Sequence, residues 1–140
     1  KLLLSEVDNF PYELHHGCCF GVDSEIHELT LQINKVVSEE LQCRIVGHPP
    51  YNPRLEAPLN FFTARLSPTD FITRNHAIVD AVDIMLAVPY MEESRQPRSG
   101  TWATIRYAKS AGKPLVVIYR DGNTEMFNGL RRETSTSPVA

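Results

Sequence analysis

The sequence has few cysteines, no excess of basic residues and no long apolar run, and each absence excludes a class of protein. Three cysteines, of which Cys18 and Cys19 are adjacent, provide no disulfide framework, so we expect a reducing, cytoplasmic setting. The net charge of −3 argues against a broad nucleic-acid-binding surface but is compatible with a local basic pocket for a small anion. Because no apolar stretch approaches the length of a membrane span, we expect no membrane association.

What the sequence does contain is an alternation of strand-like and helix-like segments over most of its 140 residues. Such alternation is typical of α/β domains with a parallel sheet. We predict an α/β, Rossmann-like fold with a mainly parallel sheet and helices on both faces. It would form one domain over residues 1–125, followed by a polar tail over 126–140. The predicted strands are 12–16, 43–47, 83–88 and 115–119, and the predicted helices are 23–37, 69–82 and 101–111.

The loop after the first predicted strand combines two glycines with an acidic residue. It reads Gly17-Cys18-Cys19-Phe20-Gly21-Val22-Asp23, and His27 follows one helical turn later. The glycines permit a tight turn and close approach of the backbone to a ligand, and Asp23 and His27 share one helical face. The pattern indicates either a cradle for ribose or phosphate, with Asp23 accepting from a hydroxyl, or a plain connection in which Asp23 caps the helix.

Two further junctions carry groups that suit an anion. Arg74 and Asn75, in the first turns of the helix over 69–82, offer a guanidinium for phosphate and an amide for a sugar or base. Arg98-Ser99-Gly100-Thr101 forms a small-residue turn at a helix start, where unpaired N–H groups and the helix dipole favour negative charge. A solvated arginine and ordinary capping are the structural alternatives. Since ligands bind beyond the carboxyl ends of parallel strands, the three junctions together predict one anion site.

The first segment also suggests a metal site, which its ligand spacing disfavours. Adjacent cysteines make poor zinc ligands, and the neighbouring strand residues His15 and His16 should point to opposite faces. We therefore predict no metal and no cofactor. A nucleophilic Cys18 or Cys19 at a helix N-terminus is chemically possible, but no base is apparent. If an aromatic ring stacks on a base, we expect Phe20 or a ring from the proline-punctuated loop over 51–68.

In this order and spacing the motifs resemble those of the SMF/DprA–LOG (SLOG) superfamily of Rossmann-like nucleotide-binding domains, with the DNA-processing branch (DprA/Smf) the closest. That branch is expected to carry a Gly-x-x-x-Gly-x-Asp loop with a His four residues later, an Arg-Asn pair opening a helix, a strand after an Asp, and a Ser-Gly-Ser/Thr turn. The matching residues are Gly17, Gly21, Asp23, His27, Arg74-Asn75, Asp83 and Ser99-Gly100-Thr101. The resemblance extends from about Tyr12 to Asp121.

Two departures from the family pattern bear on function. SLOG domains begin with a strand that ends in a Gly-(Ser/Thr)-Arg-type loop, and nothing before Tyr12 matches it, so we expect this N-terminal strand to be missing. LOG members are phosphoribohydrolases with a catalytic Glu shortly after Gly-Gly-x-Gly-Thr, where this chain has Ala103 and Thr104. Cleaving an N-glycosidic bond needs a carboxylate, and neither Asp23, Glu25 nor Glu56 is marked by its spacing.

The resemblance therefore implies binding of a nucleotide or nucleotide-derived phosphate ligand, as in a sensor module, by a homodimer. The alternative is a LOG-like nucleoside 5′-monophosphate N-glycosidase, and a third possibility is DprA-like binding of single-stranded DNA, which the acidic composition disfavours. The implied ligand-binding residues are Gly17, Cys18, Phe20, Gly21, Asp23, His27, Arg74, Asn75, Arg98, Ser99, Gly100 and Thr101.

Overall fold

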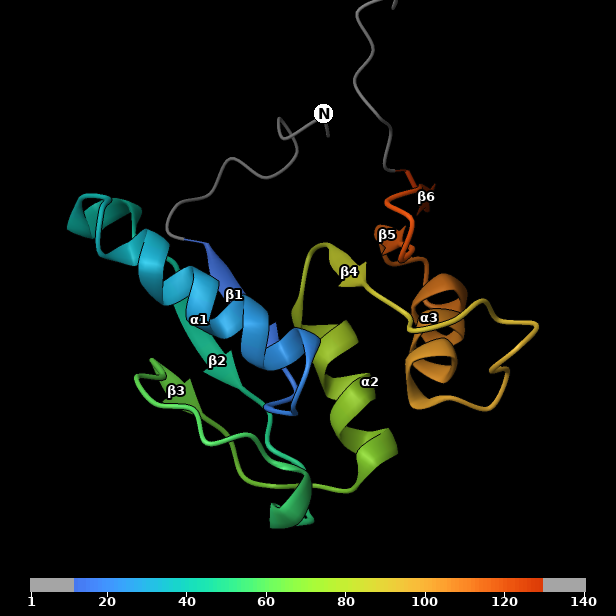
Figure 1. The fold of residues 1–140 in the computed structure, drawn as a ribbon, viewed down its shortest axis with the longest axis horizontal. Coiled ribbons are helices and arrows are strands. Elements are labelled where there is room, and N and C mark those ends of the chain that lie inside the picture. The colour runs from blue at the N-terminus through green and yellow to red at the C-terminus, as the bar shows by residue number, and fades with distance from the viewer. Residues whose placement is uncertain (1–11, 130–140) are drawn as a thin grey trace, which may run out of the picture. The chain divides into compact units, whose positions relative to one another are not determined.

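A computed structural model describes residues 12–129, which form three α-helices and two three-stranded sheets (Figure 1). The described residues fall into two compact units, an N-terminal unit over 12–81 and a C-terminal unit over 82–129. The predicted α/β class is confirmed, and three of the four strand pairs are parallel. The strands form two sheets, not one. The region before Tyr12, where the family's N-terminal strand is expected to be missing, and residues 130–140 of the predicted tail lie outside the described residues.

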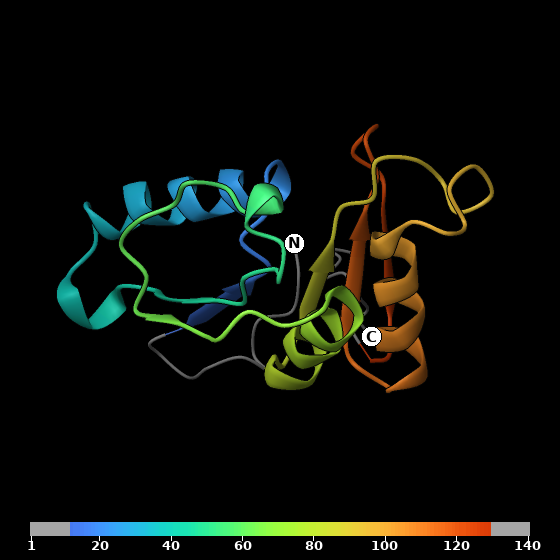
Figure 2. The ribbon, with the colours of Figure 1, turned by 90° about the horizontal axis from the view of Figure 1, so that it is seen from below.

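The N-terminal unit contains a parallel sheet in the order β1-β2-β3. Leu14 of β1 pairs with Ile45 of β2, and Val46 pairs with Ala64 of β3. Figure 2 shows α1 running along this sheet. The elements are β1 (Glu13–His16), α1 (Val22–Asn34), η2 (Glu39–Leu41), β2 (Arg44–Gly47), η3 (Pro53–Leu55), β3 (Ala64–Arg65) and α2 (Phe71–Ala81).

Both helices of this unit begin differently from the prediction. Gly21, with φ 93°, is the N-cap of α1, so Asp23 lies inside the first turn and does not cap the helix. The α2 start is marked by Asp70, whose Oδ1 accepts from the backbone N–H of Thr73 at 3.0 Å. That side-chain acceptor satisfies one of the N–H groups that a helix start leaves unpaired.

The face of α1 that is buried is polar. His27 and Thr30 are buried, whereas Leu29 and Ile33, which stand at the helical spacing of an apolar face, are each 49% exposed. The rotation of the helix is set by His27, whose ring contacts β1 and the loop before β3, as described below. Periodicity alone does not reveal this, because histidine does not count as an apolar residue in the pattern.

The C-terminal unit has a mixed sheet in the order β4-β5-β6, with β4 and β5 parallel and β5 and β6 antiparallel. Its core contains Ile105, Ala108, Leu115 and Val117, and α3 packs beside β4. Leu86, in the middle of β4, is 57% exposed, so this strand is not covered on both faces as a continuous apolar run suggests. The elements are β4 (Met85–Ala87), α3 (Gly100–Ser110), β5 (Leu115–Ile118) and β6 (Thr124–Phe127).

The ends of α3 follow the expected chemistry. Ser99 is the N-cap, its Oγ accepting from the Trp102 N–H at 3.1 Å, and Gly112 follows the helix with φ 72°. The sequence analysis does not anticipate β6, which pairs with β5 after the turn at Gly122, and the predicted domain boundary at residue 125 falls inside this strand. Within residues 12–129 no helix has both the length and the apolar character needed to cross a bilayer.

Candidate functional site

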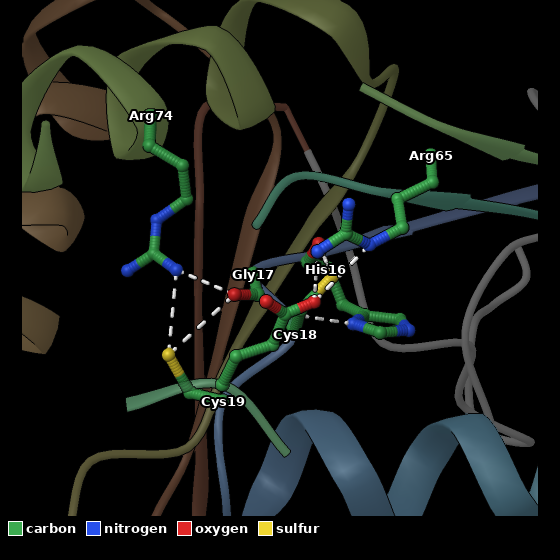
Figure 3. A network of polar contacts seen from close by, with 7 residues as sticks. His16, Gly17, Cys18, Cys19, Arg65 and Arg74 are labelled. Carbon is green, nitrogen blue, oxygen red and sulfur yellow. Dashed lines mark hydrogen bonds and ion pairs between the residues drawn. The ribbon is translucent and has the colours of Figure 1, made fainter. Parts of the chain in front are cut away.

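The loop from Gly17 to Cys19, just after β1, is held by an arginine from α2. Figure 3 shows the Arg74 side chain reaching from α2 toward the carbonyl oxygen of Gly17 and the thiol of Cys19. Arg74 Nη1 donates to Gly17 O at 2.5 Å and to Cys19 Sγ at 3.4 Å. The guanidinium carbon also lies 4.7 Å from the ring centroid of Phe71, a cation–π distance. The loop after β1 and the start of α2 are thereby joined.

Arg74 is buried but only partly satisfied. Its exposed fraction is 4%, and it forms no ion pair with a carboxylate among the described residues. Its Nε is the one buried side-chain nitrogen or oxygen within residues 12–129 that has no hydrogen-bond partner. Since a buried charge is costly unless it is paired and hydrogen-bonded, this guanidinium has spare capacity for an anionic acceptor.

The contact between Arg74 and the loop accounts for the glycine at position 17. A Cβ at Gly17 would lie 2.5 Å from Arg74 Nη1 and 3.0 Å from Asp23 Oδ2, so a side chain there would require the guanidinium to move. Cys18, the next residue, has φ 60°, a left-handed backbone that bends the loop sharply. The sequence analysis predicts close backbone approach to a ligand at this glycine, and the close approach found here is to a side chain of the same unit.

Asp23 is hydrogen-bonded to the backbone of the loop. Its Oδ2 accepts from the Cys19 N–H at 3.2 Å. Burial raises the pKa of the Asp23 carboxyl, while the backbone N–H groups of Cys19 and Gly17 and the charge of Arg74 act in the opposite direction. The Asp23 carboxyl group therefore accepts a hydrogen bond from the loop backbone and lies close enough to Arg74 for the two charges to interact.

Behind the loop, two histidines form a directed chain of hydrogen bonds. His27 Nε2 lies 2.7 Å from the carbonyl oxygen of Asn60, so this nitrogen carries the proton and Nδ1 accepts. His16 Nε2, 2.9 Å from His27 Nδ1, must then be a donor, and His16 Nδ1 accepts from the Cys18 N–H at 3.1 Å. Both rings are buried and contact Phe62. The partners thus assign one neutral tautomer to each ring.

A second histidine pair lies at the ends of β1 and β2. His15 Nε2 donates to Glu13 at 2.9 Å, and His15 Nδ1 lies 2.9 Å from His48 Nε2, which serves as donor when each ring carries one proton. Burial, together with neighbouring histidines, lowers the pKa of His16 to about 4. Burial, then His15 and Arg74, lower the pKa of His48 to about 4. The rings of His16 and His48 are therefore neutral at pH 7.

On the other side of the loop, Arg65 pairs with Glu56 and not with the loop itself. Arg65 Nε donates to Glu56 at 3.1 Å, and Figure 3 shows Arg65 approaching from the side opposite Arg74. The backbone N–H of Ala57 donates to the Cys18 carbonyl at 2.8 Å. Burial, followed by the charges of Glu56 and Asp23, raises the pKa of the Cys18 thiol to about 12, so Cys18 is not a thiolate at neutral pH.

Some of the residues that the sequence analysis selects come together in the N-terminal unit and others lie in the C-terminal unit. Gly17, Cys18, Asp23 and Arg74 share one network, and His27 joins it through His16. The sequence analysis missed His48 and Arg65 and named Glu56 only as a carboxylate not marked by its spacing. Glu56 forms a β-bridge with Cys19, Arg65 pairs with Glu56, and His48 faces His15, contacts that arise only when the chain folds. Three other selected residues of the N-terminal unit lie outside this network: Phe20 is 63% exposed, Gly21 caps α1 and Asn75 is half-buried. The remaining ones belong to the C-terminal unit, where exposed Arg98 and the Ser99-Gly100-Thr101 turn stand at the start of α3.

A separate cavity of about 800 Å³ opens in the C-terminal unit. Trp102 lines it and donates its indole N–H to the carbonyl of Met91 at 2.8 Å. Burial and the nearby carboxylates, Glu125 first, raise the pKa of Tyr119 to about 12. None of the predicted ligand-binding residues lines this cavity, whose walls include Tyr90, Glu92, Glu93, Arg95, Trp102, Lys109, Tyr119, Arg120, Asp121, Glu125 and Phe127.

Within residues 12–129 no three His, Cys, Asp or Glu side chains are arranged to hold a metal ion. The four histidines near the loop face one another in hydrogen-bonded pairs and do not converge on a common point. No protein-family model, no curated protein and no solved structure matches this chain. The chemistry of the site therefore rests on its own residues, and its best-defined property is an incompletely satisfied, buried cation beside a glycine loop.

Proposed function

We propose that this protein binds the phosphate group of a nucleotide or nucleotide-derived ligand, as a binding or sensor module with a Rossmann-like, SLOG-type fold. The observation that carries the proposal is Arg74: a guanidinium with 4% exposure, no ion pair among the described residues and an unpartnered Nε. Phosphate oxygens suit a guanidinium because they accept two parallel charge-assisted hydrogen bonds.

The loop supports the same assignment. The Gly17 carbonyl and the Phe71 ring hold the guanidinium in place before any ligand arrives, which reduces the entropy that binding would cost. In the N-terminal unit, the proposal assigns the phosphate contact to Arg74. In the C-terminal unit, Arg98 and the backbone N–H groups of 99–101 at the N-terminus of α3 form a separate candidate for an anion contact. Gly17, Gly21 and Asp23 would shape the ribose side, Asn75 would orient the ligand, and Phe20 offers an exposed ring for a base. A cytoplasmic homodimer is part of this proposal.

The test is thermal stabilisation of the full chain by inorganic phosphate and by mono-, di- and cyclic nucleotides. We expect at least one nucleotide to raise Tm in a concentration-dependent way, because a ligand that binds only the folded state stabilises it. Arg74→Lys should weaken the shift by removing the forked donor while keeping the charge, and Arg74→Ala should abolish it. Arg54→Ala, which removes an exposed arginine of the same unit, is the matched control and should leave the shift unchanged. No shift with any nucleotide would overturn the proposal.

An N-glycosidase is the second candidate, and Asp23 is the observation in its favour. Its carboxyl lies next to the Arg74 network and has a pKa raised by burial, which is the direction that a general acid requires. The test is incubation with a panel of nucleoside monophosphates, followed by chromatography for free base. Release of base that is lost in Asp23→Asn would establish the enzyme, and no release across the panel excludes it. Salt-dependent retention of single-stranded DNA in the absence of a nucleotide response would favour the third, DNA-binding function.

A further inference from the structure

The three cysteines of the chain have different surroundings, and among the described residues only the sulfur of Cys19 accepts a hydrogen bond from an arginine. Cys18 is fully buried, with its pKa raised to about 12, and burial also raises the pKa of Cys43. Cys19 is half-buried, its Sγ 3.4 Å from Arg74 Nη1 and 3.5 Å from the Gly17 carbonyl oxygen (Figure 3). Partly exposed cysteines in contact with an arginine or lysine side chain are typical of sites that react with oxidants.

We propose that Cys19 is a site of reversible oxidation by hydrogen peroxide, and that the resulting sulfenate is held by Arg74 and occupies the anion site. Oxidation at Cys19 depends only on the contact between these two residues. The further statement, that oxidation excludes a phosphate ligand, rests on the proposed function.

The reaction is a two-electron oxidation. The Cys19 thiolate attacks one oxygen of hydrogen peroxide, a sulfur–oxygen bond forms and the oxygen–oxygen bond breaks. Hydroxide leaves and takes up the proton that the thiol released, giving water, so the sulfur is oxidised and the peroxide is reduced. Ionisation of the sulfenic acid then gives a sulfenate, whose anionic oxygen is an acceptor of the kind that Arg74 lacks at Nε.

The position of Cys18 determines which product forms. The Cys18 thiol lies 4.0 Å from the His16 carbonyl and would contact a Cβ on Gly47 at 2.8 Å, whereas the Cys19 thiol lies by Gly17 and Arg74. The two adjacent thiols thus have different neighbours, and Cys18 is 0% exposed. We therefore expect a sulfenate at Cys19, which an added thiol reduces, and no disulfide between the two residues.

The experiment exposes the full-length protein to hydrogen peroxide with dimedone, which traps sulfenic acids, and assigns adducts by fragment-ion mass spectrometry. We expect the adduct at Cys19 to form at least about tenfold faster than at Cys43, and Cys18 to stay unmodified. Arg74→Gln should slow Cys19 about tenfold, while leaving Cys43 as an internal control. Arg54→Gln is the matched control and should change neither rate. Equal rates at Cys19 and Cys43, no effect of Arg74→Gln, or a Cys18–Cys19 disulfide would each overturn the inference.

Two measurements keep the outcome interpretable. Protection of Cys18 from iodoacetamide verifies that the Arg74→Gln variant is folded. If that variant unfolds, Arg74→Lys takes its place; it keeps the positive charge, so Cys19 should still form the adduct at least about tenfold faster than Cys43. Wild-type protein is also oxidised with and without inorganic phosphate. Slower oxidation in phosphate supports the shared anion site. Selective oxidation of Cys19 without phosphate protection, together with no nucleotide-induced rise in Tm, would sustain the redox site and reject the proposed function.

Discussion

Arg74 Nη1 lies 2.5 Å from the carbonyl oxygen of Gly17, although 57 positions separate the two residues in the sequence. The same nitrogen would lie 2.5 Å from a Cβ on Gly17. Arginine and glycine are therefore a matched pair: the buried guanidinium occupies the volume that any side chain at Gly17 would need. The anion site that we propose depends on this fit, because it holds the positive charge at the loop.

The first prediction concerns Gly17→Ala. The added methyl group must displace the Arg74 guanidinium, so we expect the free energy of unfolding to fall by about 1–3 kcal/mol, as for overpacked sites. Nucleotide-induced stabilisation should disappear as well. Urea denaturation followed by circular dichroism measures the first effect, and thermal shift measures the second.

Gly47→Ala is the control for this variant. Its Cβ would meet Phe62 at 2.6 Å and the Cys18 thiol at 2.8 Å, so it crowds the same unit away from Arg74. We expect a comparable loss of stability but a preserved nucleotide response. If Gly17→Ala binds nucleotide as the wild type does, the Gly17–Arg74 pair is not part of the ligand site.

The second prediction is a pH dependence that originates in the buried histidines. His16 and His48 have pKa values lowered to about 4, against 6.5 in the unfolded chain, so the unfolded state binds more protons between these values. Their contribution to stability is complete above pH 6.5 and is lost as the pH falls toward 4. Urea midpoints measured at intervals from pH 7.5 to pH 4 should therefore decrease with acidification.

Asp23 acts in the opposite direction, and a His48 variant separates the two effects. Because the pKa of the Asp23 carboxyl is raised on folding, its contribution decreases as the pH rises above 3.8. His48→Gln retains an N–H donor for His15 but cannot take up a proton. The slope of the unfolding free energy against pH between pH 6.5 and 4, which gives the number of protons taken up on unfolding, should therefore decrease by the equivalent of about one proton. An unchanged slope in this variant would show that His48 is not a source of the acid sensitivity.

The third prediction tests the cap of α3. Ser99→Ala removes the oxygen that accepts from the Trp102 N–H, and we expect a loss of about 1 kcal/mol in unfolding free energy. Ser110→Ala, at the exposed end of the same helix, is the control and should be neutral or slightly stabilising. A fall in the nucleotide-induced rise in Tm that exceeds this stability loss would show that the turn at 99–101 itself contacts phosphate.

The fourth prediction concerns the cavity of the C-terminal unit. The pKa of Tyr119 is raised to about 12 by burial and by its hydrogen bond to Glu125, so its phenol should ionise well above pH 10 in an alkaline absorbance titration. Glu125→Gln removes a negative neighbour and should bring that pKa toward 10, and Tyr119→Phe should delete the same step. A titration that Tyr119→Phe leaves unaltered would contradict the assignment.

The sequence was informative wherever a local rule sufficed. β1 and β5 lie within one residue of their predicted ranges, and the N-cap at Ser99 and the glycine after α3 are where propensity places them. Capping and turn chemistry depend on residues within one helical turn, so the residues next to each other in the sequence are enough to predict them. β3, only two residues long, and β6 were missed because their pairing partners, and not their own composition, make them strands.

Sequence alone determined the α/β character of this protein, the glycine loop after β1 and the presence of Arg74 at the start of α2. Only the tertiary structure decided that Arg74 is buried against Gly17, that His27 and not an apolar stripe anchors α1, and that the Cys19 sulfur accepts from Arg74 while Cys18 is fully buried. The physical reason is distance along the chain. Propensities act between close neighbours, whereas the burial of a charge and the partners of a histidine depend on segments 11 to 57 positions apart that meet only when the chain folds.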